Sequence, residues 1–203
     1  TTLSGEDLKK TELYHANAER RRAQAAFADY GAYLDSLEMT ATIRGFEPLY
    51  IQRIAQLTNK SNQFNLTTLR CSEDDIRAMA EKPAWLCLYG KLVDKFGDNG
   101  VVTVVAGEAE GETLHLRLWL MSCRVLKRGM EDAMMDAVVA DAAARGIKTI
   151  RGYYYPTAKN GMVKEFYAGM GFAKTAEDAD GNTTWELAVE GYAPRHPHMQ
   201  IER

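Results

Sequence analysis

Leucine alternates with other residues across the segment TLHLRLWLM, residues 113–121. A period of two is typical of a β-strand, in which successive side chains point to opposite faces. The alternation predicts that four leucines share one face: Leu114, Leu116, Leu118 and Leu120. Earlier runs at 84–94 and 101–106 predict two more strands, with turns at 98–100 and 107–111. We expect the three strands to form an antiparallel meander.

Other parts of the chain carry the longer period of amphipathic helices. Apolar spacing and capping residues predict helices over 5–30, 45–65, 72–82, 130–144 and 160–170. Short β-type runs predict strands over 38–44, 147–154 and 183–189. This order favours an α/β protein of the α+β type, with a central, mostly antiparallel sheet flanked by helices.

Composition narrows the class of protein. The chain has 203 residues, of which 46% are hydrophobic and 26% charged, with a net charge of -3. That balance argues against general nucleic-acid binding, which favours a basic surface. Three widely spaced cysteines give neither a disulfide framework nor a CxxC metal site, and no run approaches the ~20 apolar residues of a membrane span. We expect a cytoplasmic location and no membrane partner.

The first part of the chain differs from the rest. Residues 1–36 are rich in charge, and their pattern predicts a helical arm. The pattern of residues 37–203 predicts one domain. The chain begins with Thr1 instead of Met. We therefore expect the arm to lead in from a preceding domain.

The segment SCRVLKRGMED, residues 122–132, follows the leucine strand and opens a helix. It gathers three cations, Arg124, Lys127 and Arg128, beside Gly129. Helix N-termini attract anions through free backbone N–H groups and the helix dipole. The turn is a candidate phosphate site, although a plain strand-to-helix turn would also use a glycine and tolerate surface charge.

The order of elements resembles the GNAT fold of acyl-CoA N-acyltransferases. That family has an Arg/Gln-x-x-Gly-x-Gly/Ala turn after its fourth strand, which Arg124 and Gly129 match at the first and last positions, with Lys127 in place of the middle glycine. A later segment, NGMVKEFYAGMGF, resembles the second signature of the family. The resemblance implies that CoA or phosphopantetheine binds where the sheet splays, between 113–121 and 147–154. The implied binding residues are Met121, Cys123, Arg124, Lys127, Arg128, Gly129, Met130 and Asn160.

Four motifs in order give a closer resemblance, to the C-terminal half of FkbH-like proteins. They are IAQLTNKSNQFNLTT, FGDNG, WLMSCRVLKRGMED and YYPTAKNGMVKEFYAGMGF. Such proteins join a HAD-type phosphatase domain to a GNAT-like half and load a glyceryl unit onto an acyl carrier protein in polyketide biosynthesis. The resemblance therefore implies two partners: an acyl carrier protein and a preceding HAD-type domain of the same protein.

Two residues are catalytic candidates. The resemblance makes Tyr167 the general acid for the departing thiolate, and core packing on a helix is its other interpretation. Cys123 lies at the end of the leucine strand beside Arg124, where a thiolate could carry the acyl group, or it is an inert cysteine. Asn160 either caps the helix that follows it or contacts the pantetheine arm.

Other polar residues are candidates for binding the acyl group. Asn62, Gln63 and Asn65 form either a hydrogen-bonding segment or a solvated loop. Arg117 and Trp119 point away from the predicted leucine face and would line an acyl pocket or be covered by a helix. His196 and His198 lack a third ligand nearby, so we expect no metal in this domain.

Three functions stay open at this point. The first is a GNAT-like acyltransferase domain that binds a phosphopantetheine thioester. The second is a non-catalytic module that docks a carrier protein for a separate HAD active site. The third, an amine N-acetyltransferase, would need a general base, and residues 114–121 contain no acid.

Overall fold

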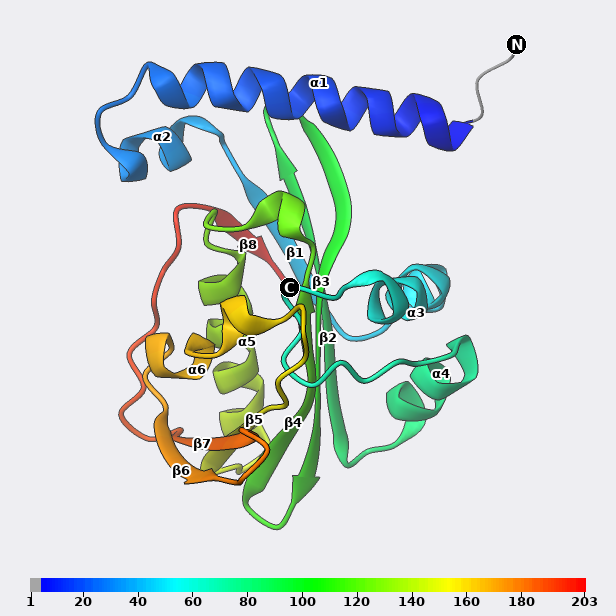
Figure 1. Ribbon diagram of the computed structural model, residues 1–203, viewed down its shortest axis with the longest axis vertical. Coiled ribbons are helices and arrows are strands. Elements are labelled where there is room, and N and C mark those ends of the chain that lie inside the picture. The colour runs from blue at the N-terminus through cyan, green and yellow to red at the C-terminus, as the bar shows by residue number, and fades with distance from the viewer. Residues whose placement is uncertain (1–4) are drawn as a thin grey trace.

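The computed structural model describes the backbone of residues 5–203 and the side chains from residue 8 onward. Its centre is one eight-stranded sheet with the order β6-β7-β5-β4-β3-β2-β1-β8 (Figure 1). Neighbouring strands are antiparallel except for two parallel pairs, β4 with β5 and β1 with β8. The predicted meander is confirmed, since β2, β3 and β4 pair in sequence order.

The strands are β1 (Thr40–Arg44), β2 (Trp85–Asp94), β3 (Gly97–Glu110), β4 (Thr113–Met121), β5 (Thr149–Tyr154), β6 (Ala173–Glu177), β7 (Thr183–Ala188) and β8 (Gln200–Glu202). The helices are α1 (Gly5–Ala25), α2 (Tyr30–Ser36), α3 (Ile51–Lys60), α4 (Glu73–Glu81), α5 (Met130–Ala144) and α6 (Phe166–Gly169). Short 3-10 turns are η1 (Pro48–Tyr50), η2 (Cys123–Val125) and η3 (Gly161–Val163).

Helices cover both faces of the sheet. Figure 1 shows α5 and α6 on one face, α3 and α4 on the other, and α1 lying across one end. The larger apolar cluster joins the sheet to α5, while a smaller one joins it to α3 and α4. Burial of these two apolar faces is the main force that holds the layers together.

The sheet splays between β4 and β5, as the sequence predicted. The two strands pair only from Thr113 to Leu116 and from Thr149 to Gly152. Beyond that point the residues 64–67 enter the gap. The N–H of Leu66 donates to the carbonyl of Trp119 at 3.0 Å, and the N–H of Met121 donates to the carbonyl of Phe64 at 3.0 Å. The chain's own segment therefore occupies the gap in which the sequence predicted that a ligand would enter.

A β-bulge changes the predicted face of β4. Ala106 pairs with Leu118 and Gly107 with Leu116, so Arg117 is an extra residue without a partner in the register. An extra residue reverses the alternation that follows it. Leu114 and Leu116 stay with the α5 cluster, whereas Leu118 and Leu120 join the α3 cluster. The prediction that all four leucines share one face is wrong for this reason.

Several predicted boundaries also move. The helix expected over 5–30 ends at Ala25, and a separate helix, α2, begins at Tyr30, where the Asp29 side chain accepts a hydrogen bond from Gly31 N–H. The helix expected over 45–65 ends at Lys60, and the one over 160–170 is divided into η3 and α6. The turn expected at 98–100 lies earlier, after Asp94. Strands β6 and β8 were not predicted.

A buried ion cluster attaches α1 to the sheet. The Arg20 guanidinium donates to both carboxylate oxygens of Asp94, at 2.5 and 2.7 Å, and these side chains are 3% and 0% exposed. Arg128 adds a second cation 3.6 Å from Asp94. The carboxylate also accepts hydrogen bonds from the N–H groups of Phe96 and Gly97. In the part of the chain that the structure describes, no helix is both long enough and apolar enough to cross a membrane.

Candidate functional site: a cationic cleft at the end of β4

A cleft of about 1220 Å³ lies where α1, α3 and the end of β4 meet. Its walls include Tyr50 and Arg53 from the start of α3, Lys91 from β2, and the segment 121–124 that ends β4 and forms η2. The residues 61–64 line it on the side of the splay. Segments far apart in sequence thus build one opening, large enough for a small-molecule arm.

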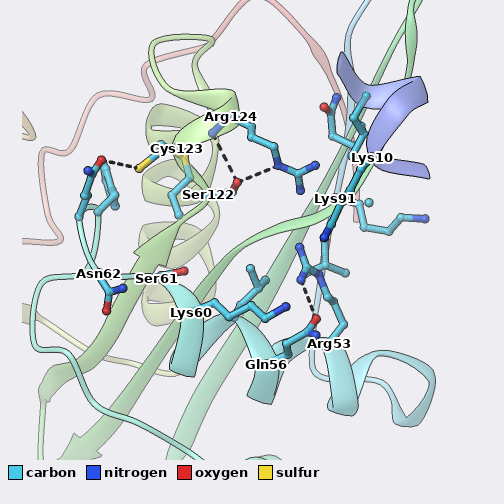
Figure 2. Close-up of a pocket in the computed structure, with 18 of the residues that line it drawn as sticks. Lys10, Arg53, Gln56, Lys60, Ser61, Asn62, Lys91, Ser122, Cys123 and Arg124 are labelled. Atoms are coloured by element: carbon cyan, nitrogen blue, oxygen red, sulfur yellow. Dashed lines mark hydrogen bonds between the residues drawn. The ribbon is translucent and has the colours of Figure 1, made fainter. Parts of the chain in front are cut away.

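The cleft is strongly cationic. Its described lining contains seven cations and, as its only carboxylate, Asp98; the cations are Lys9, Lys10, Arg53, Lys60, Lys91, Arg124 and Lys159. Figure 2 shows Arg124 and Arg53 entering the same space from opposite walls, with Lys91 and Lys60 beside them. Such a concentration of one charge in a hollow raises the local concentration of anions.

Three of these cations lack a carboxylate partner among the described residues. Among the described side chains, no carboxylate lies within 4.0 Å of Arg53, Lys91 or Arg124. Burial, and secondly the charge of Arg124, lowers the pKa of Arg53. Burial also lowers the pKa of Arg124. Both shifts reflect charge that is held away from water and that a bound anion would stabilise.

Neutral groups hold the cations in place. Arg53 donates to Gln56 Oε1 at 2.8 Å, and Arg124 Nε donates to Ser122 Oγ at 3.3 Å. Lys91 Nζ lies 3.4 Å from the Tyr50 hydroxyl and 5.4 Å from the centre of its ring. These contacts orient the positive groups and leave their charge uncompensated.

Cys123 lies at the rim of this cleft. Its thiol is exposed and donates a hydrogen bond to Gln63 Oε1 at 3.3 Å. The other two cysteines are less accessible, and burial raises the pKa of Cys71 to about 11 and of Cys87 to about 12. Of the three thiols, Cys123 is the one that a bound ligand could reach.

The structure brings some of the predicted site residues together. Met121, Cys123 and Arg124 line the cleft, and so do Asn62 and Gln63. Asn65 is buried instead, with its amide bonded to Ser61 O and Thr68 N–H. Sequence reasoning missed Arg53, Lys60 and Lys91. The positions of Arg53, Gln56 and Lys60, at i, i+3 and i+7 of a helix, place them on one face and are the signal that could have indicated the first two.

Asn160 has a structural role at the splay. Its amide donates to the carbonyls of Asn65 and Tyr155, at 3.0 and 2.9 Å, and its oxygen accepts from Thr157 N–H. It makes no capping hydrogen bond to the turn that follows. The side chain thus fastens the inserted segment to the end of β5, away from the cleft.

Tyr167 is completely enclosed. It is 1% exposed, and its ring packs against Trp119, Phe172 and the backbone of Gly152. Burial raises the pKa of its hydroxyl well above the usual value, and the hydroxyl, near the backbone of Tyr153, makes no well-directed hydrogen bond. This geometry is that of a core residue. Trp119 is buried beside it, and Arg117 pairs with Glu108 at 3.6 Å on the opposite face from the α5 core.

Of the predicted diphosphate turn, residues 124–129, Arg124 is the one residue that lines the described part of the cleft. Arg128 is directed to Asp94 and to the carbonyl of Arg124, at 2.8 Å. The N–H of Lys127 donates to the carboxylate of Glu131. A Cβ on Gly129 would come within 2.9 Å of Pro197, so the C-terminal segment covers this turn. Met130 is fully buried. Glu131 and the C-terminal segment therefore occupy the space at this turn, where the sequence predicted a CoA diphosphate.

This architecture is the GNAT fold: a mixed, mostly antiparallel sheet that splays after its fourth strand, with helices on both faces. Solved structures agree. The ribosomal-protein-S18-alanine N-acetyltransferase from Escherichia coli superposes with a TM-score of 0.56 at 13% identity, over 77% of this chain and 98% of that chain.

Two further structures with the fold contain CoA. The spermidine N-acetyltransferase from Vibrio cholerae, in complex with CoA and spermine, gives a TM-score of 0.56 at 10% identity, over 73% of this chain and 95% of that chain. The PaiA N-acetyltransferase from Thermoplasma acidophilum, in complex with coenzyme A, gives a TM-score of 0.53 at 15% identity, over 73% of this chain and 98% of that chain. No protein-family model and no curated protein matches the sequence.

Proposed function

We propose that this GNAT-fold domain binds a phosphopantetheine thioester and takes part in acyl transfer, with the arm presented by an acyl carrier protein. The observation that carries the proposal is the cleft itself, in which Arg53, Lys91 and Arg124 converge beside the exposed thiol of Cys123, with no carboxylate partner among the described side chains. A phosphate monoester supplies the missing negative charge, and charge-assisted hydrogen bonds to it are strong.

The resemblance to FkbH-like proteins supports a carrier protein over a free small molecule. In such proteins the GNAT-like half works beside a HAD-type domain, and the acyl group is a glyceryl-type three-carbon unit. Polar side chains at the cleft rim, Asn62 and Gln63, suit a hydroxylated acyl group. The cationic opening also suits the acidic surface expected of a carrier protein.

A docking module without chemistry of its own is the second candidate. The burial of Tyr167 favours it, because an enclosed phenol with a raised pKa cannot donate a proton to a leaving thiolate in the cleft. An amine N-acetyltransferase has less support, since Asp98 is the only carboxylate in the described lining of the cleft.

Calorimetric titration tests the binding proposal. The parent domain should bind a carrier protein that bears phosphopantetheine more tightly than the same carrier without it. Arg53→Gln and Arg124→Gln should each weaken binding of the complete carrier at least tenfold, because a charge-assisted contact contributes about 1.5–3 kcal/mol. Arg77→Gln is the matched control, since Arg77 lies on the outer surface of α4 and pairs with Glu73 and Asp74.

Equal affinity for the two carrier forms, or for the parent and both cleft variants, would refute the proposal. Transfer itself is tested in the presence of the acyl donor. If Cys123 carries the acyl group, Cys123→Ser should load the carrier more than tenfold more slowly. Tyr167→Phe should load it at the parental rate, because its hydroxyl is enclosed. Loading at the parental rate by both variants would identify the docking module.

A further inference from the structure

The turn that begins α5 forms a cradle of backbone N–H groups. Lys127 and Gly129 both adopt left-handed backbone, with φ of 63° and 103°. Successive N–H groups in such a turn point into one concavity, which attracts negative charge together with the dipole of the 15-residue helix α5. A carboxylate or a phosphate oxygen is the kind of group that fits there.

The chain's own Glu131 lies in this cradle. Its side chain folds back so that Oε2 accepts the Lys127 N–H at 3.3 Å. The carboxylate also meets the N–H groups of Gly129 and of Glu131 itself. The other oxygen, Oε1, is buried and has no hydrogen-bond partner among the residues that the structure describes. Burial raises the pKa of this carboxyl, whereas the surrounding N–H groups hold it down.

Two other segments close the cradle from outside. Pro197 lies against Gly129 so closely that an added Cβ would approach it to 2.9 Å. The chain around Pro197 is held by Asp136, whose carboxylate accepts the N–H groups of Arg195 and His196. On the other side, the Tyr30 hydroxyl of α2 donates to the carbonyl of Lys127. An external anion would have to move this cover as well as Glu131.

A second anion cannot share the cradle with the first. Two negative groups around the same N–H donors repel each other, and the helix dipole compensates only about half a charge. In the cationic cleft, by contrast, Arg53 and Arg124 have no carboxylate partner in the part of the chain that the structure describes. The cleft and the cradle therefore differ in their affinity for an external anion. The cleft attracts one, whereas the cradle already holds the Glu131 carboxylate.

We propose that Glu131 is an internal anion that excludes a nucleotide diphosphate from the α5 cradle. The domain then accepts a thioester arm that carries one phosphate and gains nothing from the ADP half of CoA. Glu131 acts as a specificity-determining residue that favours a carrier-bound arm over free CoA. The preference between the two ligands rests on the proposed function, whereas the occupancy of the cradle does not.

Amide chemical shifts in the parent protein test the occupancy directly, with ADP as the probe. Millimolar ADP should leave the amide resonances of Lys127, Gly129 and Glu131 unmoved. The same three resonances should follow the titration of the Glu131 carboxyl as pH is lowered. Movement of these amides with sub-millimolar ADP, or no response to that titration, would overturn the proposal.

Calorimetry tests the preference. Free CoA and 4′-phosphopantetheine should bind the parent with Kd values within about threefold of each other. Glu131→Ala removes the internal carboxylate and frees the N–H donors, so that CoA should gain at least tenfold over 4′-phosphopantetheine after the cost of displacing the Pro197 segment. Glu73→Ala is the matched control, an exposed acid in the first turn of α4. It should leave the ratio of the two Kd values unchanged.

The two proposals fail in different ways. Binding of CoA to the parent tenfold or more tightly than 4′-phosphopantetheine would overturn the role of Glu131 and leave the cleft proposal intact. Failure of both ligands to bind would refute the proposed function, and the amide titration alone would then decide the occupancy of the cradle. Should Glu131→Ala fail to fold, the parent measurements still decide both points.

Discussion

Asp94 is the residue whose loss should affect stability most clearly. Its carboxylate is 0% exposed and is surrounded by two cations, Arg20 and Arg128, which are 3% and 9% exposed. In Asp94→Asn both guanidinium groups stay in the protein without a carboxylate. Breaking a buried ion pair from one side costs about 3–5 kcal/mol, because the remaining charge is uncompensated. That is a large part of the ~5–15 kcal/mol by which a domain is usually stable.

Urea unfolding, followed by circular dichroism and by tryptophan fluorescence, measures the effect. With a slope of about 2 kcal/mol per molar, the expected loss lowers the midpoint by roughly 1.5–2.5 M. The matched control is Asp74→Asn, whose carboxylate is 94% exposed and pairs with Arg77 on the surface of α4. Its midpoint should equal that of the parent, because an exposed ion pair contributes little.

The same variant should loosen α1. Arg20 belongs to α1 and bonds to Asp94, so removal of the carboxylate should speed tryptic cleavage at the cluster Arg20, Arg21 and Arg22. A midpoint within about 0.5 M of the parent, together with unchanged cleavage, would refute the idea that this ion cluster holds the helix to the sheet.

Two further predictions concern the core and the thiols. Gly152→Ala should lower stability by about 1–3 kcal/mol in a thermal melt, because its Cβ would approach the Tyr167 ring to 2.6 Å. The control is Gly161→Ala, whose Cβ would meet nothing within 4 Å. Equal melting temperatures of the two variants would show that the ring can move away. Cys123 should react with a thiol reagent at pH 8 well before Cys71 and Cys87, since it is exposed and burial raises the pKa of the other two to about 11 and about 12. Peptide mapping that finds early label on Cys71 or Cys87 would contradict this.

Much of the fold could be read from the sequence because its signals are local. Strand β4 has the predicted bounds, since alternation over 113–121 gives it a clear period. The helix α5 is predicted well for the corresponding reason. The bulge at Arg117 could not be read, because an inserted residue leaves the run of leucines intact while it changes which face they occupy. The short edge strand β8 depends on pairing with β1, 160 residues earlier in the chain, which no local pattern records.

The candidate site was harder to predict for a related reason. The segment 121–124 and the amides near residue 62 stand out in the sequence, and both line the cleft. In the sequence, Arg53 and Lys60 fit the solvent-exposed face of an ordinary amphipathic helix. Only the tertiary fold brings them opposite Arg124. Arg128 shows the reverse. It belongs to the most cationic turn of the chain, yet its partner is Asp94, which a sequence pattern cannot pair with it.

In this GNAT fold, groups of the chain itself occupy three positions that the resemblance assigned to ligand binding or catalysis. The gap between β4 and β5 is hydrogen-bonded to residues 64–67, the helix N-terminus holds Glu131, and the tyrosine of the second signature is enclosed in the core. Each of these groups satisfies internally a demand that a ligand could otherwise meet. The cations Arg53, Lys91 and Arg124, which pair with no described carboxylate, converge on the other side of η2. A fold does not by itself determine a function. The function of this domain therefore has to be sought in the cationic cleft, whose positive charge a bound anion would neutralise.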